Sequence, residues 1–214
     1  LPTASISVNN NSQCLNNQNF VVDLTSTSVS SHNWTFSSAN HVQLTNSNTK
    51  ATVKYSSPGA YTGKIWIKDL NGCVDDSTFT LTVKNIPTAD ISSSPLKSCL
   101  KGNSFTLSDA SSGVGTNSLN STGYTWFIDS LNGLTYTGTG ANTASNKIIS
   151  YTTAGTKTIG LAVTDQNGCK DTSWTSIDVL DHPVINSIAS NANSSCLNSN
   201  LFTYTANINW VSTS

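Results

Sequence analysis

Five cysteines are the residues of this chain whose type and spacing could do covalent chemistry: Cys14, Cys73, Cys99, Cys169 and Cys196. They lie in polar, loop-like sequence, and no two form the C-x-x-C pair of zinc sites, so their spacing favours disulfides. Disulfides persist in oxidising compartments outside the cytoplasm. We therefore expect an exported protein held together by cystine bridges.

Other chemistry-bearing residues are sparse. The histidines His32, His41 and His182 have no Cys, His or Glu at ligand spacing. The chain has no G-x-S-x-G elbow and no Walker-type loop. The stretch Gly113-Val114-Gly115 is too short for a phosphate cradle, and we interpret it as a flexible insertion. The sequence predicts a protein that is not an enzyme.

One acidic cluster, Asp69, Asp75 and Asp76, lies close to Cys73. Carboxylates and backbone carbonyls are the oxygen ligands that calcium prefers, so these residues are weak candidates for a calcium site. The alternative is that they are solvated turn acids that guard strand ends against edge-to-edge pairing. Apart from this calcium candidate, we expect no cofactor and no metal.

The composition narrows the class of partner. Charged residues make up 10% of the chain, and Glu, Arg and Met are absent. A net charge of −1, without the arginine fork that reads phosphate and guanine, excludes nucleic acid. No apolar run is long enough to span a bilayer, so we expect no membrane insertion. No leader peptide is visible at Leu1, and we interpret the chain as a mature or internal segment of a longer one.

The elements that carry these residues repeat along the chain. Matching segments recur twice or three times: Leu1–Ile6 with Ile86–Ile91; Cys14-Leu15 with Cys99-Leu100 and Cys196-Leu197; Trp34 with Trp126 and Trp210; and Asn71-Gly72-Cys73 with Asn167-Gly168-Cys169. The two copies differ in length only in loops, as a shared fold predicts. We predict two complete repeats, residues 1–86 and 87–183, and a partial third, residues 184–214.

Each complete repeat is predicted to be an all-β, immunoglobulin-like sandwich of about seven strands, because short strand-like runs alternate with turn signals. In the first copy the runs are Ala4–Val8, Phe20–Thr25, Asn33–Phe36, His41–Leu44, Lys50–Tyr55, Tyr61–Lys68 and Ser77–Val83. The Asn-Gly pairs predict a hairpin between the last two strands. Trp34 and Trp126 are predicted core residues, whereas Trp66 and Trp174 have no counterpart in the other copy.

The motif order is specific enough to suggest a family. The second copy carries Tyr124-Thr125-Trp126, Ala154-Gly155-Thr156 and the run Val163–Asp171. This pattern resembles the PKD and related Ig-like repeats of very large Bacteroidota surface proteins, including SprB-type gliding-motility adhesins exported by the type IX system. Many PKD domains have Asp-Phe-Gly-Asp-Gly after the strand-three Trp; here Trp34–Ser38 and Trp126–Ser130 depart from it, which puts a calcium role of that turn in doubt.

The resemblance implies a structural stalk or filament segment of a secreted adhesin on the surface of a Gram-negative bacterium, acting in gliding or attachment. Its partners would be neighbouring repeats, and surface polysaccharide or other cell-surface proteins. Members of that phylum are often O-glycosylated at Asp-Ser/Thr motifs, which implies Ser77 and Ser130 as acceptors; an ordinary turn is the alternative. A second hypothesis is a carbohydrate-binding or spacer module of a secreted polysaccharide hydrolase, which needs exposed aromatics in a row.

Two disulfide pairings are open. The internal pairing joins Cys14 to Cys73 and Cys99 to Cys169, but these positions lie at opposite ends of a sandwich, roughly 25 Å apart, whereas bonded Cα atoms lie within about 7 Å. The favoured pairing joins Cys14 of the first copy to Cys169 of the second. Cys73, Cys99 and Cys196 would then await partners in other copies, and free thiols are the third alternative.

Overall fold

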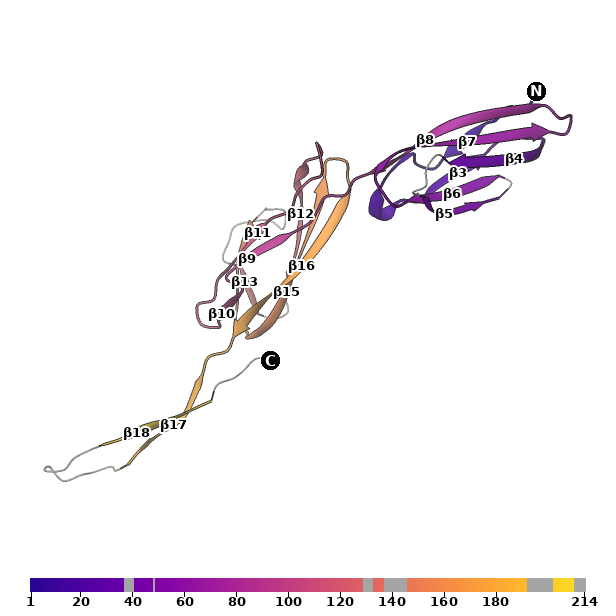
Figure 1. Ribbon diagram of the computed structural model, residues 1–214. Helices are drawn as coiled ribbons and strands as arrows, with labels where there is room; N and C mark the ends of the chain where they lie inside the picture. Colours follow the sequence, from indigo (N-terminus) through magenta and orange to yellow (C-terminus); the bar gives the residue numbers. More distant parts are fainter. Residues whose placement is uncertain (37–40, 48, 129–132, 137–145, 192–201, 210–214) are drawn as a thin grey trace. The chain divides into compact units, whose positions relative to one another are not determined.

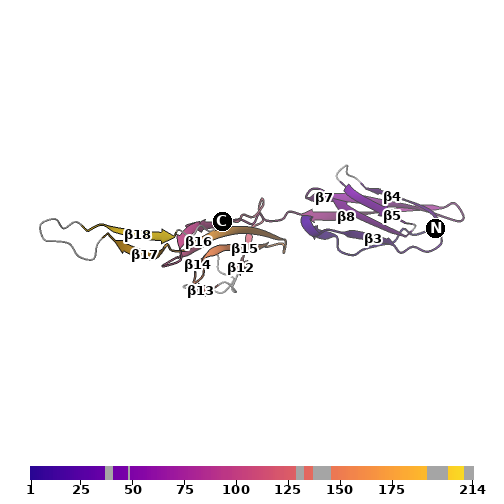
Figure 2. The same cartoon turned by 90° about the horizontal axis from the view of Figure 1, so that it is seen from below.

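The computed structural model is all-β, which confirms the predicted fold class. It describes residues 1–36, 41–47, 49–128, 133–136, 146–191 and 202–209 (Figure 1, Figure 2). Within these ranges the one helical element is the 3-10 turn η1, Leu15–Asn17. The strands are β1 Ile6–Val8, β2 Ser12–Cys14, β3 Phe20–Leu24, β4 Val29–Phe36, β5 His41–Asn46, β6 Lys50–Tyr55, β7 Gly59–Asp69, β8 Val74–Lys84, β9 Ile91–Ser94, β10 Lys97–Cys99, β11 Phe105–Asp109, β12 Leu119–Ile128, β13 Leu134–Tyr136, β14 Asn146–Tyr151, β15 Gly155–Asp165, β16 Lys170–Leu180, β17 Val184–Ser190 and β18 Tyr204–Asn209.

Each complete repeat pairs its strands into two four-stranded sheets. The first repeat has the orders β1-β3-β6-β5 and β2-β8-β7-β4, and the second has β13-β14-β11-β9 and β10-β16-β15-β12. The strands β17 and β18 form a separate two-stranded sheet, on which Ile185 and Ile188 are exposed. The orders of the two repeats correspond strand for strand, as the repeated sequence predicts.

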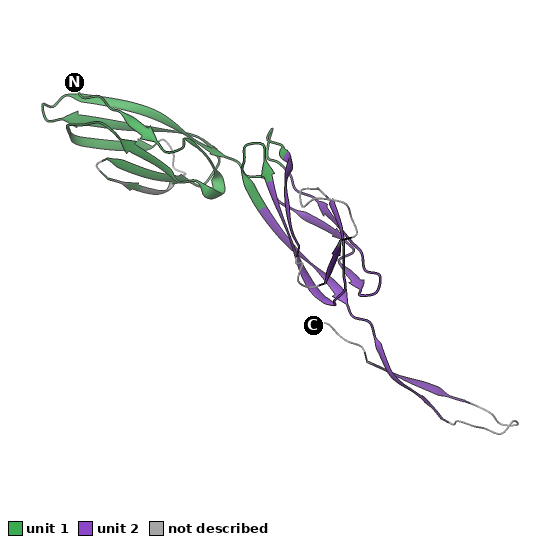
Figure 3. Cartoon of the chain, turned by 180° about the vertical axis from the view of Figure 1, so that it is seen from behind, with its two compact units in different colours: residues 1–88, 113–119, 164–171 green, residues 89–112, 120–163, 172–214 purple. Residues whose placement is uncertain are grey.

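The chain divides into two compact units whose borders differ from the repeat borders (Figure 3). Unit 1 comprises residues 1–88, 113–119 and 164–171, and unit 2 comprises residues 89–112, 120–163 and 172–214. The turn between β15 and β16 and the loop before β12 therefore group with the first sandwich, although both belong to the second repeat in sequence.

Alternating strand positions fill the cores. On β7 the inward positions Tyr61, Gly63, Ile65 and Ile67 are buried, and the residues that alternate with them face outward. The predicted core residues Trp34 and Trp126 are 6% and 3% exposed. This period-two burial is what a sandwich strand with one face in the core requires.

Two short strands, β2 and β10, were not predicted from the sequence. The three-residue strands β2 and β10 each pair in parallel with the last strand of their repeat, where Cys14 lies opposite Lys84 and Cys99 lies opposite Leu180. A run of three polar residues has no measurable periodicity, so only the pairing reveals it. The described residues of the first repeat thus form eight strands, β1 to β8, against about seven predicted.

Tyr55 is a buried, ionisable residue in the core of the first repeat. Its ring is 3% exposed and stacks on Tyr61 with ring centroids 3.7 Å apart. Its hydroxyl has no hydrogen-bond partner among the described residues. Burial, with a smaller effect from Tyr61, raises the pKa of Tyr55 to about 12.

Because an unfolded tyrosine ionises near pH 10, the stability that neutral Tyr55 contributes is complete below pH 10 and is lost as the pH rises towards 12. We expect the free energy of unfolding to fall by about 1 kcal/mol more in the wild type than in Tyr55→Phe between pH 9 and pH 11, measured by urea unfolding. Equal losses in the two proteins would contradict the assignment.

Candidate functional site

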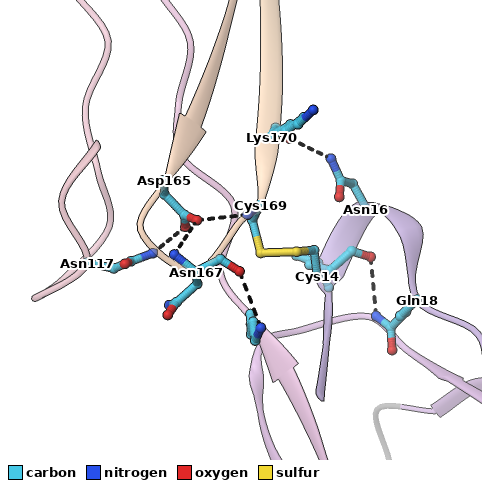
Figure 4. Close-up of a disulfide and its surroundings, with 10 residues drawn as sticks. Cys14, Asn16, Gln18, Asn117, Asp165, Asn167, Cys169 and Lys170 are labelled. Carbon is cyan, nitrogen blue, oxygen red and sulfur yellow. Dashed lines mark hydrogen bonds between the residues drawn. A yellow bond between two sulfur atoms is a disulfide. The ribbon is translucent and has the colours of Figure 1, made fainter. Parts of the chain in front are cut away.

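The structure joins Cys14 of the first repeat to Cys169 of the second by a disulfide, the pairing that the sequence favoured (Figure 4). The two Cα atoms lie 5.6 Å apart, although the residues are separated by 155 positions in sequence. Both cysteines belong to unit 1. The candidate functional site is this bridge and the residues that hold it.

The register of the last strand explains why the pairing is not internal. Cys14 lies opposite Lys84, the last residue of β8, whereas Cys73 immediately precedes Val74, its first. Because β8 is eleven residues long, the two cysteines are held roughly 35 Å apart. Cys99 and Cys169 lie at the two ends of β16 in the same way, opposite Leu180 and before Lys170.

The turn that presents Cys169 is organised by one carboxylate. Oδ1 of Asp165 accepts hydrogen bonds from the backbone N–H groups of Asn167, at 2.9 Å, and Cys169, at 2.8 Å. Gly168 has φ +81°, the left-handed conformation that closes a three-residue hairpin loop. The cysteine is thus held by main-chain contacts before any bond to sulfur is considered.

The first repeat builds the same turn around Cys73. Oδ1 of Asp69 accepts from the N–H of Asn71 at 2.9 Å and of Cys73 at 2.8 Å, and Gly72 has φ +85°. The Asp-x-Asn-Gly-Cys motif is therefore a rigid carrier for a cysteine. The sequence identified Asn-Gly as the hairpin signal, and the structure adds the preceding Asp as the residue that shapes it.

The second turn has an additional support from the loop expected to be a flexible insertion. In that loop, residues 113–117 form a compact turn closed by a bridge between Val114 and Asn117. A Cβ on Gly113 would lie 2.0 Å from the carbonyl oxygen of Asn117, so glycine is required there. The side-chain amide of Asn117 donates to Oδ2 of Asp165 (Figure 4). Asp165 is 1% exposed, and this bond satisfies its second oxygen.

The segment that carries Cys14 is held in place by the buried side-chain amide of Gln18. Oε1 of Gln18 accepts from the backbone N–H of Tyr55 at 3.0 Å, and its Nε2 donates to the carbonyls of Tyr55, at 2.7 Å, and Leu15, at 3.3 Å. These bonds tie the turn after Cys14 to the end of β6. The residue was missed in the sequence because a buried Gln is unusual.

Asn103 does the same in the second repeat. Its side chain accepts from the N–H of Tyr151 and donates to the carbonyls of Tyr151 and Leu100, all at 2.7 Å. An amide residue four positions after each Cys-Leu pair begins is the repeated signal that could have revealed this clamp.

Two further contacts link the partners of the disulfide. Nδ2 of Asn16 donates to the carbonyl of Lys170 at 2.8 Å, and Nζ of Lys84 donates to the carbonyl of Asn167 at 3.3 Å. Both use backbone acceptors on the hairpin, so they depend on its shape rather than its side chains. Asn16, Lys84 and Lys170 line a polar cleft beside Cys14. The side-chain amides of Asn9, Gln13 and Asn16 in this cleft donate to backbone carbonyls, which favours a structural role.

The calcium candidates do not form a common site. Asp69 shapes its turn, Oδ2 of Asp75 accepts from the N–H of Ala4 at 2.7 Å, and Asp76 forms an ion pair with Lys64 at 3.0 Å. Asp75 and Asp76 are successive strand residues and point to opposite faces. No cluster of three or more His, Cys, Asp or Glu residues exists in the described part of the chain.

The remaining predicted site residues are scattered. Cys73 is half-buried and Cys99 exposed, and neither is bonded to a described residue. Ser77 lies half-buried within β8, opposite Ile65, rather than in a turn. Cys196 and Ser130 lie outside the described residues. Beside Cys99, the Thr156 hydroxyl and the Lys97 ammonium hold the pKa of Asp178 below its usual value.

Comparison with known proteins gives no family. No family model matches, and no curated protein matches in sequence. The fold is similar to the D00–D0 domain of intimin, which is 11% identical over 84% of this chain and 100% of that one, with a TM-score of 0.36. It is also similar to the fibronectin(III)-like modules of Clostridium thermocellum CbhA, which are 14% identical over 83% of this chain and 95% of that one, with a TM-score of 0.40. A third similar structure is that of the eight N-terminal Ig domains of Down syndrome cell adhesion molecule, which are 14% identical over 85% of this chain and 25% of that one, with a TM-score of 0.46. These alignments are too loose to support an argument about function, and the PKD resemblance stays a prediction.

In the described part of the chain, no helix has the length and apolar character needed to cross a membrane.

Gln18→Ala tests the amide clamp. The substitution leaves the buried N–H and C=O of Tyr55 without partners, so we expect a loss of about 2 kcal/mol in the free energy of unfolding. The matched control is Gln166→Ala, whose side chain is exposed on the hairpin and which should change stability by less than about 0.5 kcal/mol. Equal stability of the two variants in urea unfolding would rule out the clamp.

Proposed function

We propose that this chain is a tension-carrying structural segment of a long, exported cell-surface adhesin, with no catalytic role. The observation that carries the proposal is the disulfide between Cys14 and Cys169, which encloses residues 15–168 in one covalent loop. Tension applied to the two ends passes through the sulfur bridge and does not reach the strands inside the loop. Most of both repeats is thereby protected from extension.

The size of the effect follows from chain geometry. A fully extended polypeptide gains about 3.5 Å per residue, so opening a loop of 155 residues would lengthen the chain by roughly 500 Å. With the bridge in place, the same two Cα atoms stay 5.6 Å apart. Such a bypass limits extension under load, which supports the role of a segment that carries tension.

An extracellular location is consistent with the disulfide between Cys14 and Cys169. Disulfides persist outside the cytoplasm, which supports an extracellular location. The finer reading, a gliding or attachment adhesin exported by the type IX system of a Gram-negative bacterium, is supported by the sequence resemblance to PKD-type repeats. In such an array the first partners of each repeat are the neighbouring repeats of the same chain.

Single-molecule pulling from residue 1 to residue 214 tests the bypass. We use a Cys73→Ser/Cys99→Ser/Cys196→Ser background, in which only the observed bridge can form. The oxidised protein should extend only through residues outside the loop, and reduction, or the further change Cys14→Ser/Cys169→Ser, should add roughly 50 nm. Release of the full length by the oxidised protein would refute the proposal.

Among the described residues, Cys73 and Cys99 form no disulfide, and each occupies a position equivalent to one of the bonded cysteines. Cys73 lies in a turn of the first repeat that is shaped by an Asp in the same way as the turn of Cys169 in the second. Cys99 lies in β10, the three-residue parallel strand that corresponds to the β2 strand of Cys14. We propose that Cys73 bonds to a strand cysteine of a preceding repeat and Cys99 to a hairpin cysteine of a following one. The side chains around Cys99 differ, since Leu180 occupies the place of Lys84, but the backbone acceptors of the hairpin are common to both turns.

Mixing two variants tests this pairing. Cys99→Ser/Cys196→Ser keeps the hairpin thiol, and Cys73→Ser/Cys196→Ser keeps the strand thiol. With glutathione disulfide as the oxidant, which takes up the two electrons and two protons, we expect mixed dimers to exceed the half share that random pairing of equal amounts gives. A statistical share of mixed dimers, counted by mass spectrometry without reductant, would contradict complementary pairing.

A further inference from the structure

An exposed aromatic pair lies on the outer face of one sheet in unit 2. Trp174 of β16 is 59% exposed and Phe127 of β12 is 44% exposed, and their ring centroids are 5.6 Å apart with 24° between the planes. Between these two strands runs β15. The pair therefore spans the width of three strands and presents a nearly continuous aromatic surface to solvent.

Gly160 of β15 holds the indole against the sheet. A Cβ at Gly160 would lie 2.6 Å from Cζ3 of Trp174, so any side chain there would lift the ring. Gly160 is itself buried, although it points away from the core that Ile159 and Leu161 fill. Trp174 thus lies flat on the backbone, with its other face open.

The surroundings of the pair are rich in hydroxyl groups. Strand alternation places three threonines and one serine on the same outer face, two residues from Phe127, Gly160 or Trp174, and all four are exposed: Thr125, Thr158, Thr172 and Ser176. A hydroxyl group both donates and accepts hydrogen bonds. The other two positions at this spacing are Ala162 and Asp129, of which Asp129 lies outside the described residues, so none of the flanking positions carries a lysine or an arginine.

The first repeat has nothing comparable at the corresponding positions. There Thr35, Lys64 and Thr78 lie side by side on β4, β7 and β8, and Lys64 is paired with Asp76. The aromatic pair is therefore a feature of the second repeat and is not needed by the fold. Sequence comparison marked Trp174 as unmatched but could not show that Phe127 lies next to it.

We propose that Phe127 and Trp174 form a stacking platform for neutral pyranose rings of a polysaccharide. The C–H face of a sugar packs on an aromatic ring, and its hydroxyls can bond to the threonine and serine hydroxyls at the edge. Two rings offer at most a few hundred Å² of contact, which suits a saccharide, whereas a stable protein interface needs about 800 Å² on each side. The lack of a flanking positive charge disfavours an anionic glycan.

Affinity electrophoresis tests the platform with four soluble neutral polysaccharides, whose backbones are glucose, galactose, mannose and xylose, and with alginate as the anionic probe. We expect at least one neutral polymer to retard the wild-type chain. Trp174→Thr should raise the dissociation constant tenfold or more, Phe127→Thr should weaken binding less, and the exposed control Leu70→Ala should leave it unchanged.

Thermal melting followed by circular dichroism identifies any variant that has lost its fold, and Trp174→Phe then replaces Trp174→Thr as the test because it keeps an aromatic cover on Gly160 and should retain part of the binding. Retardation by none of the neutral polymers, retardation by alginate alone, or undiminished binding of a folded Trp174→Thr protein would each overturn the proposal. The pulling experiment on the disulfide is independent of all these outcomes.

Discussion

The length and pairing of β8 and β16 constrain where the four cysteines among the described residues can bond. Each of these strands has eleven residues, with a cysteine-bearing turn before its first residue and a cysteine-bearing parallel strand beside its last. The strand acts as a rigid spacer of roughly 35 Å, far beyond the reach of a disulfide. The two cysteines of one repeat therefore cannot bond to each other.

The groups that hold the two thiols are polar, buried and repeated. Asp69 and Asp165 shape the hairpin turns, while Gln18 and Asn103 clamp the turns after the strand cysteines to Tyr55 and Tyr151. A buried amide or carboxylate is retained at low cost only when all its hydrogen bonds are made, so each of these contacts favours one local conformation. Rigid carriers keep the cysteines oriented without help from the sulfur bond.

The two repeats share the features that carry the disulfide but differ on the outer face of one sheet. The bridge from Cys14 to Cys169 depends on features that both copies share, whereas the Phe127–Trp174 pair occurs where the first copy has Thr35 and Thr78. Outer sheet faces tolerate such divergence because they contribute little to the core. The turns and short strands that carry the cysteines are thus common to both copies, whereas the outer sheet face differs between them.

The sequence by itself determined the local features of this protein. Period-two burial, the Asn-Gly-Cys turns and the core positions of Trp34 and Trp126 follow from side-chain alternation and backbone preference within a few residues, and the β6 strand, Lys50–Tyr55, matches its prediction. The favoured bond between Cys14 and Cys169 came from the repeated spacing together with the length of a strand.

Only the tertiary structure decided the contacts between residues that are distant in sequence. The three-residue strands β2 and β10, the docking of Asn117 on Asp165 and the approach of Phe127 to Trp174 all depend on strand order and register. A short polar run, a glycine-rich loop and an unmatched tryptophan carry no periodic signal of their own. Their roles arise from which backbone lies beside them, and that is set by the packing of whole sheets.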